Sequence, residues 1–246
     1  MEVPNLRETK LWINGKWEDT EEVYELKSPY TGDTIAKVAK ATPSDVERAI
    51  EGAHKAYQNF KKTTAYERAE ILYKVVDLIR KRKQEFAEIL ASEAGKPITA
   101  ALGELDRTIA TYQFSAEAAK QSFGETVPMD AAPGTKGRIG YTKRVPLGVV
   151  SAITPFNFPF NLVAHKLGPA FAVGNAVVLK PATQTPLSAI VMAEIFKEAG
   201  LPDGALQIVT GSGGELSDTL VTHPLVKKVT FTGSGAVGLK IKEKVG

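Results

Sequence analysis

Residues 148–186 of the sequence are GVVSAITPFNFPFNLVAHKLGPAFAVGNAVVLKPATQTP. Two short apolar runs, VVSAIT and AVVLKP, stand on either side of a longer stretch whose apolar residues follow helical spacing. Strands that are apolar on both faces and are joined by a helix indicate a βαβ unit of a parallel sheet. Within this helix, we expect Pro169 to introduce a kink and Gly174 to mark the end.

The same alternation continues after this unit. The stretch TPLSAIVMAEIFKEAG predicts a second helix, with Thr185 as its cap, Pro186 at its first position and Gly200 just after its end. Two further apolar runs follow, LQIVT and KVTFT. The four runs predict an α/β fold, with a Rossmann-like open parallel sheet and flanking helices. In such a sheet a ligand lies beyond the carboxyl ends of the strands.

The N-terminal part predicts short strands followed by helices. LWINGKW alternates apolar and polar residues around an Asn-Gly turn, which indicates an edge hairpin with Trp12 and Trp17 as packing residues. Thr42 as a cap and Pro43 at the first position begin an amphipathic helix.

Further helices and a projecting arm are expected before the sheet. Thr64 and Glu67 form a capping-box pattern that begins one long helix, which we expect to end near Gly95. A third helix is predicted from about residue 99 to 122. The alternating segment 138–145 lies among glycines and prolines and predicts a projecting β-arm. Exposed strand edges pair readily with another chain, so the arm predicts oligomerisation.

Composition narrows the classes of function. The 246 residues are 43% hydrophobic and 24% charged, and their 31 basic and 28 acidic residues are interspersed, which gives neither a nucleic-acid footprint nor an acidic tail. There is no cysteine, so no disulfide, thiolate metal site or cysteine nucleophile lies within these residues, and no metal site is predicted. Without an apolar signal region or a long apolar run, we expect no membrane partner and a cytoplasmic location.

Four distinctive loops follow the four predicted strands. They are TPFNFP at 154–159, KPATQTP at 180–186, TGSGG at 210–214 and TGSGAVG at 232–238. Each has a plain alternative, since such glycines are common in turns, Lys180 could be a snorkelling surface lysine, and Asn157 could cap the next helix. Because the carboxyl ends of parallel strands share one edge, the loops are expected to meet, which favours a ligand site.

These residues resemble a known family. ITPFNFPFNLVAHKLGPAFAVGNAVVLKPATQTPL, GLPDGALQIVTGSG and KKVTFTGSGAVG are similar to motifs of the NAD(P)-dependent aldehyde dehydrogenase superfamily. The likeness extends over the chain, from LWINGKW through RVPLGVV. It implies three parts, with residues 1–125 as the N-terminal part of the cofactor-binding domain, 126–146 as an oligomerisation arm and 147–246 as the NAD(P)-binding core. A homodimer or homotetramer is then expected for the full-length protein.

The resemblance also implies site residues. Asn157 matches the amide that holds the oxyanion of a thiohemiacetal, a role that needs a neutral and preorganised donor. Lys180 matches the lysine that meets the adenosine ribose hydroxyls of NADP or NAD. The implied cofactor residues are Ile153, Thr154, Pro155, Phe156, Lys180, Ala182, Thr183, Gly213, Phe231, Thr232, Gly233, Ser234 and Val237.

Two departures from the family pattern bear on specificity. Many NAD-preferring members carry a glutamate three residues after the lysine, and this chain has Thr183 there, which removes a repulsion of the 2′-phosphate and predicts that NADP is accepted. Phe158, Asn161 and His165 match one side of the aldehyde tunnel, where other members often have larger apolar residues. Asn161 and His165 favour a hydroxylated aldehyde or a semialdehyde over a long apolar one. No proton-transfer role is assigned to His165, and the role of Lys166 stays open.

The reaction of the family needs a cysteine nucleophile and a glutamate base, which the resemblance places after the equivalent of Gly246. We therefore interpret the chain as the N-terminal portion of a longer dehydrogenase and expect the isolated chain to be inactive, with exposed apolar surface. Two alternatives remain, which are a complete, non-catalytic nucleotide-binding or oligomerising module and a dehydrogenase that passes its acyl group to coenzyme A.

Overall fold

The computed structural model describes residues 7–245 and is built around a six-stranded sheet with the order β11-β8-β9-β10-β2-β3. Four neighbouring strands are parallel, namely β8 (Val149–Ile153), β9 (Ala176–Lys180), β10 (Leu206–Ile208) and β11 (Val226–Phe231). The predicted parallel sheet is therefore confirmed. The sheet is nonetheless mixed, because the predicted hairpin, β2 (Leu11–Ile13) and β3 (Lys16–Glu18), adds two antiparallel strands beside β10.

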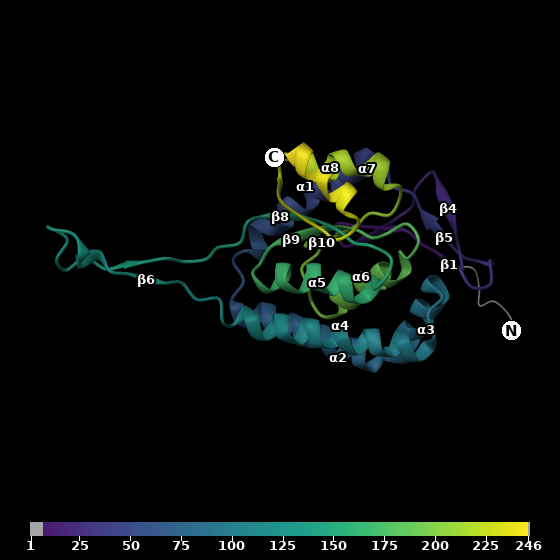
Figure 1. The fold of residues 1–246 in the computed structure, drawn as a ribbon, viewed down its shortest axis with the longest axis horizontal. Coiled ribbons are helices and arrows are strands. Elements are labelled where there is room, and N and C mark those ends of the chain that lie inside the picture. Colours follow the sequence, from purple (N-terminus) through teal and green to yellow (C-terminus); the bar gives the residue numbers. More distant parts are fainter. Residues whose placement is uncertain (1–6, 246) are drawn as a thin grey trace.

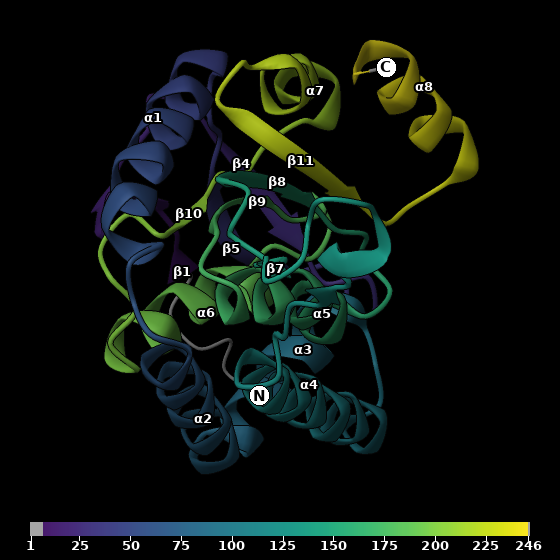
Figure 2. The ribbon, with the colours of Figure 1, turned by 90° about the vertical axis from the view of Figure 1, so that its left-hand side faces the viewer.

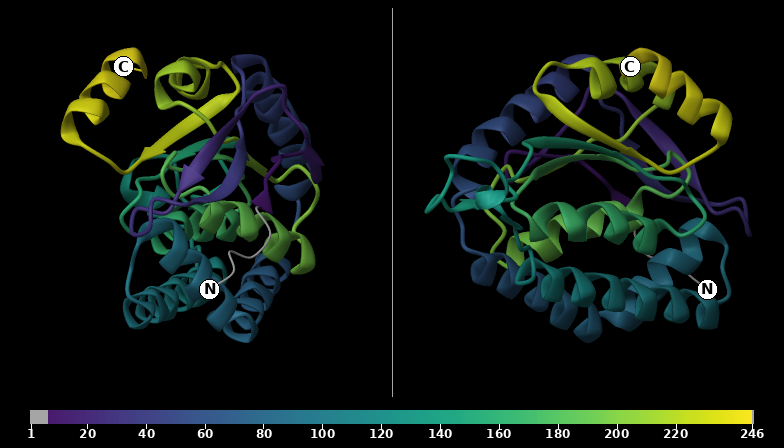
Figure 3. Two further views of the ribbon diagram at one scale, coloured as in Figure 1. Left: turned by 90° about the vertical axis from the view of Figure 1, so that its right-hand side faces the viewer. Right: turned by 60° about the vertical axis from the view of Figure 1, so that its left-hand side comes forward.

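Helices cover both faces of this sheet, as Figures 1 and 2 show. One face carries α1 (Pro43–Phe60), α7 (Gly213–Thr222) and α8 (Gly235–Val245). The other face carries α5 (Pro159–Ala172) and α6 (Leu187–Glu198). An outer layer beyond α5 and α6 consists of α2 (Ala65–Lys81), α3 (Lys83–Ala94) and α4 (Ile98–Ala119), most clearly in the right-hand view of Figure 3.

The buried core is divided by the sheet. One cluster lies between the sheet, α5, α6 and the outer helices, and includes Phe60, Phe171 and Phe196. A smaller cluster lies between the sheet, α1 and α7. Helix α8 contributes no buried residue among those described, and Leu239 on it is 63% exposed. Apolar surface is therefore exposed around α8, as expected from the sequence.

The predicted N-terminal caps of α1 and α2 are confirmed. Thr42 accepts a hydrogen bond from the Asp45 backbone N–H, and the Asp45 carboxylate accepts one from the Thr42 N–H. Thr64 and Glu67 form the same reciprocal pair at the start of α2. Both signals are local in sequence, so they could be identified without tertiary information.

The single long helix predicted from Thr64 to Gly95 is wrong, because it breaks at Arg82 into α2 and α3. Arg82 has φ −104° and ψ 18°, outside the helical range, and its guanidinium donates to both carboxylate oxygens of Glu85 and lies over the Phe86 ring. The break separates α2 from α3, which contacts α6 as well as α4. No glycine or proline marks it, so the sequence pattern continued without interruption.

The predicted cap of α6 is also wrong. The helix begins at Leu187, with Pro186 at the N-cap position, and the buried Thr185 hydroxyl has no hydrogen-bond partner in the described part of the chain. Instead, the carboxylate of Glu93 on α3 accepts hydrogen bonds from the backbone N–H groups of Leu187 (2.8 Å) and Ser188 (2.9 Å). The helix starts one residue later than predicted, so Thr185 lies too far upstream to cap it.

The remaining strands form two small sheets. β4 (Val23–Lys27), β5 (Thr34–Ala39) and β1 (Arg7–Glu8) make one of them. The predicted arm projects from the body in Figure 1, but only two residues on each side pair, in β6 (Thr126–Val127) and β7 (Gly140–Tyr141). The expected strand over 138–145 is thus shorter. The three domain boundaries stay predictions, and within residues 7–245 no helix combines the length and apolar character needed to cross a bilayer.

Candidate functional site

The four predicted loops begin side by side at the carboxyl edge of the sheet. The Thr154 N–H donates to the Lys180 carbonyl (3.2 Å), and the Thr232 N–H donates to the Ile153 carbonyl (3.1 Å). On the other side, the Val209 N–H donates to the carbonyl of Leu179 (3.0 Å). These bonds continue the pairing of the strands past their ends, so the loops after β11, β8, β9 and β10 share one edge.

Lys180 lies buried at this edge, with 5% of its surface exposed. Its Nζ donates to the Pro181 carbonyl at 3.1 Å and to no other group in the described residues, so N–H donors stay free. Burial lowers the pKa of Lys180 to about 8 because no carboxylate offsets the loss of water. A snorkelling surface lysine would be exposed, so that alternative is wrong.

The N-terminus of α7 borders this lysine. A Cβ added at Gly213 would lie 3.9 Å from the Lys180 Cε atom. Ser212, at the N-cap of α7, makes no side-chain capping bond, so the first N–H groups of the helix have no side-chain partner there. Uncapped helix N–H groups beside a buried cation fit an anionic ligand such as a pyrophosphate.

The loop after β11 carries the last of the predicted cofactor residues. A Cβ at Gly233 would lie 2.4 Å from the end of the Phe231 ring, so a larger residue there would require this ring to move. Ser234 accepts a weak hydrogen bond from the Val237 N–H (3.4 Å) at the start of α8. The other predicted cofactor residues of these loops are half-buried or exposed near the same edge, except for the buried Thr154: Ile153, Pro155, Phe156, Ala182, Thr183, Thr232 and Val237. These residues are uncharged, so the positive charge at this edge comes from Lys180 and the N-terminus of α7.

Thr183 connects the loop after β9 to its neighbours. Its hydroxyl donates to the Gly211 carbonyl (3.2 Å), and its own carbonyl accepts a hydrogen bond from the Tyr24 hydroxyl (3.2 Å). Burial, with the nearby charge of Glu93, raises the pKa of Tyr24 well above its ordinary value, so it remains a donor. Thr183, three residues after Lys180, is thus a neutral residue that is hydrogen-bonded through both its hydroxyl and its backbone carbonyl.

Asn157 is exposed in the loop between β8 and α5. It does not cap α5, because the N-cap residue is Phe158 and that position makes no side-chain capping bond. Its backbone carbonyl accepts a hydrogen bond from Lys96, whereas its side-chain amide bonds to none of the residues from 7 to 245. The amide is therefore free to donate to a group outside the described chain.

The predicted tunnel residues lie at the N-cap of α5, for Phe158, and on α5 itself, for Asn161 and His165. Phe158 is 39% exposed, His165 is exposed, and Asn161 is half-buried, with its side-chain oxygen accepting from Thr111 (3.2 Å). Farther along, His165 and Lys166 line a hollow of about 330 Å³ with Lys228 and Thr230 of β11, and no carboxylate lines it. Burial, followed by the charge of Lys228, lowers the pKa of Lys166. Two lysines and no carboxylate therefore line this hollow.

Three charged residues of the outer layer were not predicted, namely Glu93 on α3, Glu104 on α4 and Lys96 in the turn between these helices. Glu93 caps α6, Glu104 bonds to the start of α5, and Lys96 lies between them in sequence. Burial raises the pKa of Glu93 to about 7, although the bonds from α6 act in the opposite direction. Both carboxylates lie among the apolar residues on the buried side of their helices. A charged residue at such a position is rare unless it has a partner, and this is the sequence signal that could have identified them.

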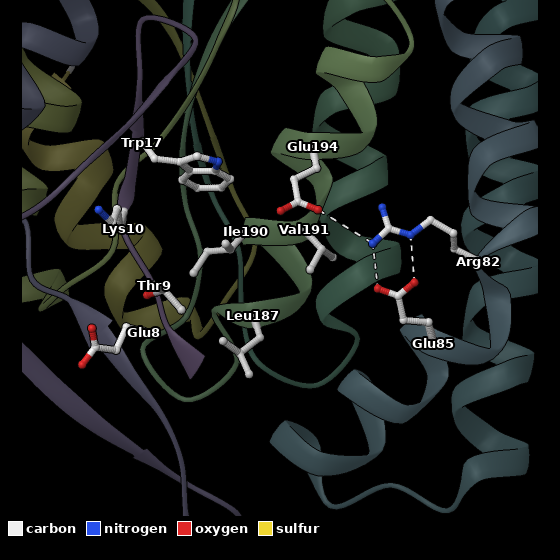
Figure 4. A pocket seen from close by; sticks show the side chains of 10 residues that line it. All are labelled: Glu8, Thr9, Lys10, Trp17, Arg82, Glu85, Leu187, Ile190, Val191 and Glu194. Carbon is white, nitrogen blue, oxygen red and sulfur yellow. Dashed lines mark hydrogen bonds and ion pairs between the residues drawn. The ribbon is translucent and has the colours of Figure 1, made fainter. Parts of the chain in front are cut away.

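Another hollow, of about 590 Å³, lies away from this edge and is shown in Figure 4. Its apolar wall includes Trp17, Ile190 and Val191, and Arg82 on its rim pairs with Glu85 and lies 3.7 Å from Glu194. None of the predicted site residues lines it. The candidate site is therefore the carboxyl edge of the sheet with the adjoining face of α5.

A model of the aldehyde dehydrogenase family matches residues 16–246. A 3-sulfolactaldehyde dehydrogenase of Priestia aryabhattai is 50% identical over 236 residues, which cover 96% of this chain and 49% of that protein. The chain spans about half the length of the curated relatives it matches.

Solved structures of aldehyde dehydrogenases have the same fold over nearly the whole of this chain. An NADP-dependent glyceraldehyde-3-phosphate dehydrogenase from Bacillus halodurans, complexed with NADP, has a TM-score of 0.94 and 38% identity over 97% of this chain and 51% of that chain. An NAD⁺ complex of an aldehyde dehydrogenase from Bacillus cereus has a TM-score of 0.92 and 36% identity, covering 97% of this chain and 48% of that chain.

Proposed function

The chain belongs to the aldehyde dehydrogenase family, and from that premise we propose that it forms the NAD(P)-binding half of an enzyme that oxidises an aldehyde to a carboxylic acid. The observation that supports this most is the edge of the sheet, where a buried, anion-free lysine stands beside an uncapped helix N-terminus. The exposed, unbonded Asn157 amide follows the next strand at the same edge. These are the parts needed for cofactor binding and oxyanion stabilisation.

The cofactor we propose is NADP or NAD, with NADP accepted. Lys180, Gly213 and the N-terminus of α7 would hold its phosphates and ribose, and Gly233 would allow close approach of the backbone. When bound, the cofactor supplies the hydride acceptor of the oxidation. The chain's own contribution is to neutralise the phosphates, orient the dinucleotide and keep a neutral Thr183 where a carboxylate would oppose a 2′-phosphate.

The nucleophile and the base are proposed to lie outside these 246 residues, which contain no cysteine. We expect a cysteine thiolate to attack the aldehyde carbon and the Asn157 amide to donate a hydrogen bond to the oxygen that becomes negative. Purified 246-residue material should therefore show no aldehyde-dependent reduction of cofactor. The projecting arm is proposed to pair with a second copy in the full-length protein.

The proposed substrate is a small aldehyde with an anionic tail, such as a semialdehyde. Two matched proteins are named for substrates that carry a sulfonate or a phosphate. His165 is about 9 Å along the helix axis from the first residue of α5, at a rise of 1.5 Å per residue. That spacing suits a tail of a few carbons, and the hollow there is lined by cations without carboxylates.

Replacing His165 with leucine tests this proposal in the full-length protein. We expect kcat/KM for succinic semialdehyde to fall about tenfold, since a charge-assisted hydrogen bond contributes about 1.5–3 kcal/mol. The value for butanal, which has no charge, should be unchanged. Steady-state formation of reduced cofactor measures both.

The control is His54→Leu, because His54 lies on α1 and bonds only to Gln58 among the described residues. It should leave both substrates unaffected. If the wild-type protein oxidised none of a panel of anionic and neutral aldehydes with either cofactor, the proposed function would be wrong. If it oxidised butanal in preference to succinic semialdehyde, only the substrate class would be wrong.

Binding of NADP is expected to weaken above pH 8. Below that pH, Lys180 carries its proton in the free protein, so binding needs no proton. Above it, the free lysine is neutral and the anion binds the charged form, so one proton is taken up and affinity falls by up to about tenfold per pH unit. Calorimetry at pH 7 and pH 9 in buffers of different ionisation enthalpy measures both effects.

Lys166→Met is the matched control for this pH dependence. Burial lowers the pKa of Lys166 too, but this residue lies on α5 and outside the proposed cofactor residues, so the variant should keep the slope. Lys180→Met should remove the slope together with most of the affinity. Equal NADP affinity at pH 7 and pH 9 in the wild-type protein would contradict the assignment of Lys180.

A further inference from the structure

The turn between α3 and α4 directs one lysine at the candidate site. Gly95 ends α3 with φ +63°, a left-handed conformation that glycine adopts without strain. Pro97 stands at the N-cap of α4, which restricts the residue before it to an extended conformation. Lys96 lies between these two fixed residues, so its backbone direction is set by the turn.

Lys96 contacts three groups that belong to or support the loop carrying Asn157. Its Nζ lies 2.5 Å from a carboxylate oxygen of Glu104, donates to the backbone carbonyl of Asn157, and stands 4.3 Å from the centre of the Phe158 ring. The Lys96 side chain is 21% exposed and that of Glu104 is 1% exposed. A partly buried ion pair with such partners holds its geometry better than a surface pair.

Glu104 holds the start of α5 with its other oxygen. That oxygen accepts hydrogen bonds from the backbone N–H groups of Phe160 (2.9 Å) and Asn161 (3.2 Å). The carboxylate therefore does the work of the missing side-chain cap at Phe158 and also complements the positive end of the helix. The Lys96–Glu104 ion pair thus bonds to the backbone before Phe158, at Asn157, and to the backbone after it, at Phe160 and Asn161.

We propose that Lys96 and Glu104 are positioning residues, which fix the backbone at Asn157 so that its amide points at the developing oxyanion. This inference rests on the proposed function. The Asn157 side chain has no bond of its own within residues 7–245, so its direction depends on the backbone that carries it. An electrostatic donor acts only when it is preorganised, and a displacement of about 1 Å can cost about 10²-fold in rate.

The test is Lys96→Met in the full-length protein, which keeps an apolar stem and removes the charge. We expect kcat to fall about 10–100-fold while KM for NADP stays unchanged, because the cofactor residues are not in contact with Lys96. In an Asn157→Ala background the same substitution should cause no further loss, since both act through one amide. Lys96→Arg, which restores the charge and the donors, should recover most of kcat.

Lys197→Met is the matched control. Lys197 also donates to a backbone carbonyl, that of Gly15 (3.1 Å), and lies 5.2 Å from the Trp12 ring centre, but on α6 and away from the candidate site. Its substitution should leave kcat unchanged. A second variant, Glu104→Gln, keeps one carbonyl acceptor and should lower kcat in the same direction as Lys96→Met if it folds.

The outcomes separate the two proposals. A wild-type kcat in Lys96→Met beside a lowered kcat in Asn157→Ala would overturn the inference alone. Losses that add in the double variant would also overturn it, because a purely structural cap lowers stability independently of Asn157. A full-length wild-type protein without aldehyde-dependent turnover would overturn the proposed function, and this inference with it.

Discussion

Asn157→Ala in the full-length protein is expected to lower kcat by about 10²–10³-fold, the range observed when one oxyanion donor is removed. The amide would stabilise charge that appears only in the transition state, so the loss should fall on kcat more than on substrate binding. Steady-state kinetics with saturating cofactor, followed by single-turnover measurement of hydride transfer, would locate the loss in the chemical step.

The structure also predicts how stable the Asn157→Ala variant should be. Asn157 is exposed, does not cap α5 and has an unbonded amide, so its removal should leave the free energy of unfolding within about 0.5 kcal/mol of wild type. Thermal unfolding of the same preparation measures this. A large loss of activity with unchanged stability distinguishes a role in the reaction from a role in the fold.

Two further variants sharpen the interpretation. Asn157→Asp has the same size but places a carboxylate beside the developing oxyanion, so its kcat should be at least as low as that of the alanine variant. Asn59→Ala removes an exposed asparagine near the end of α1 and should change nothing. A wild-type kcat in Asn157→Ala would exclude this residue as the oxyanion donor.

The parts of the fold that could be predicted from the sequence are those with local signals. The buried strands are continuous apolar runs, the hairpin has an Asn-Gly turn, and the caps at Thr42 and Thr64 have their partners three residues away. Such signals need no knowledge of what lies opposite in space. They were enough to place the four loops on one edge of the sheet.

The parts that could not be predicted depend on residues far apart in the chain. Glu93 caps a helix 94 residues later and Glu104 caps one 56 residues later, and nothing near Leu187 or Phe160 indicates either partner. The break at Arg82 likewise has no helix-breaking residue to mark it, and α3, which follows it, contacts both α4 and α6. Long-range packing thus overrode the local cap predicted at Thr185.

Thr183→Glu is expected to reduce NADP affinity by about 100-fold and to leave NAD affinity within a few-fold of wild type. The carboxylate would stand three residues after Lys180, where it would repel a 2′-phosphate, and such like-charge contacts cost several kcal/mol. Loss of the Thr183 bond to the Gly211 carbonyl would cost about 0.5–1.5 kcal/mol for both cofactors alike. Calorimetric titration with each cofactor gives the ratio of affinities, in which that common cost cancels.

Thr183→Gln separates charge from size, because glutamine fills nearly the same space as glutamate without its charge. This variant should keep the wild-type ratio of NADP to NAD affinity, while Thr183→Glu should shift the ratio toward NAD. Lys180 is buried without a nearby carboxylate, and its pKa is therefore lowered. The carboxylate of Thr183→Glu should raise this pKa again, so NADP binding should depend less on pH above pH 8. If both variants lost NADP affinity equally, the shape of the loop and not the charge at residue 183 would determine cofactor preference.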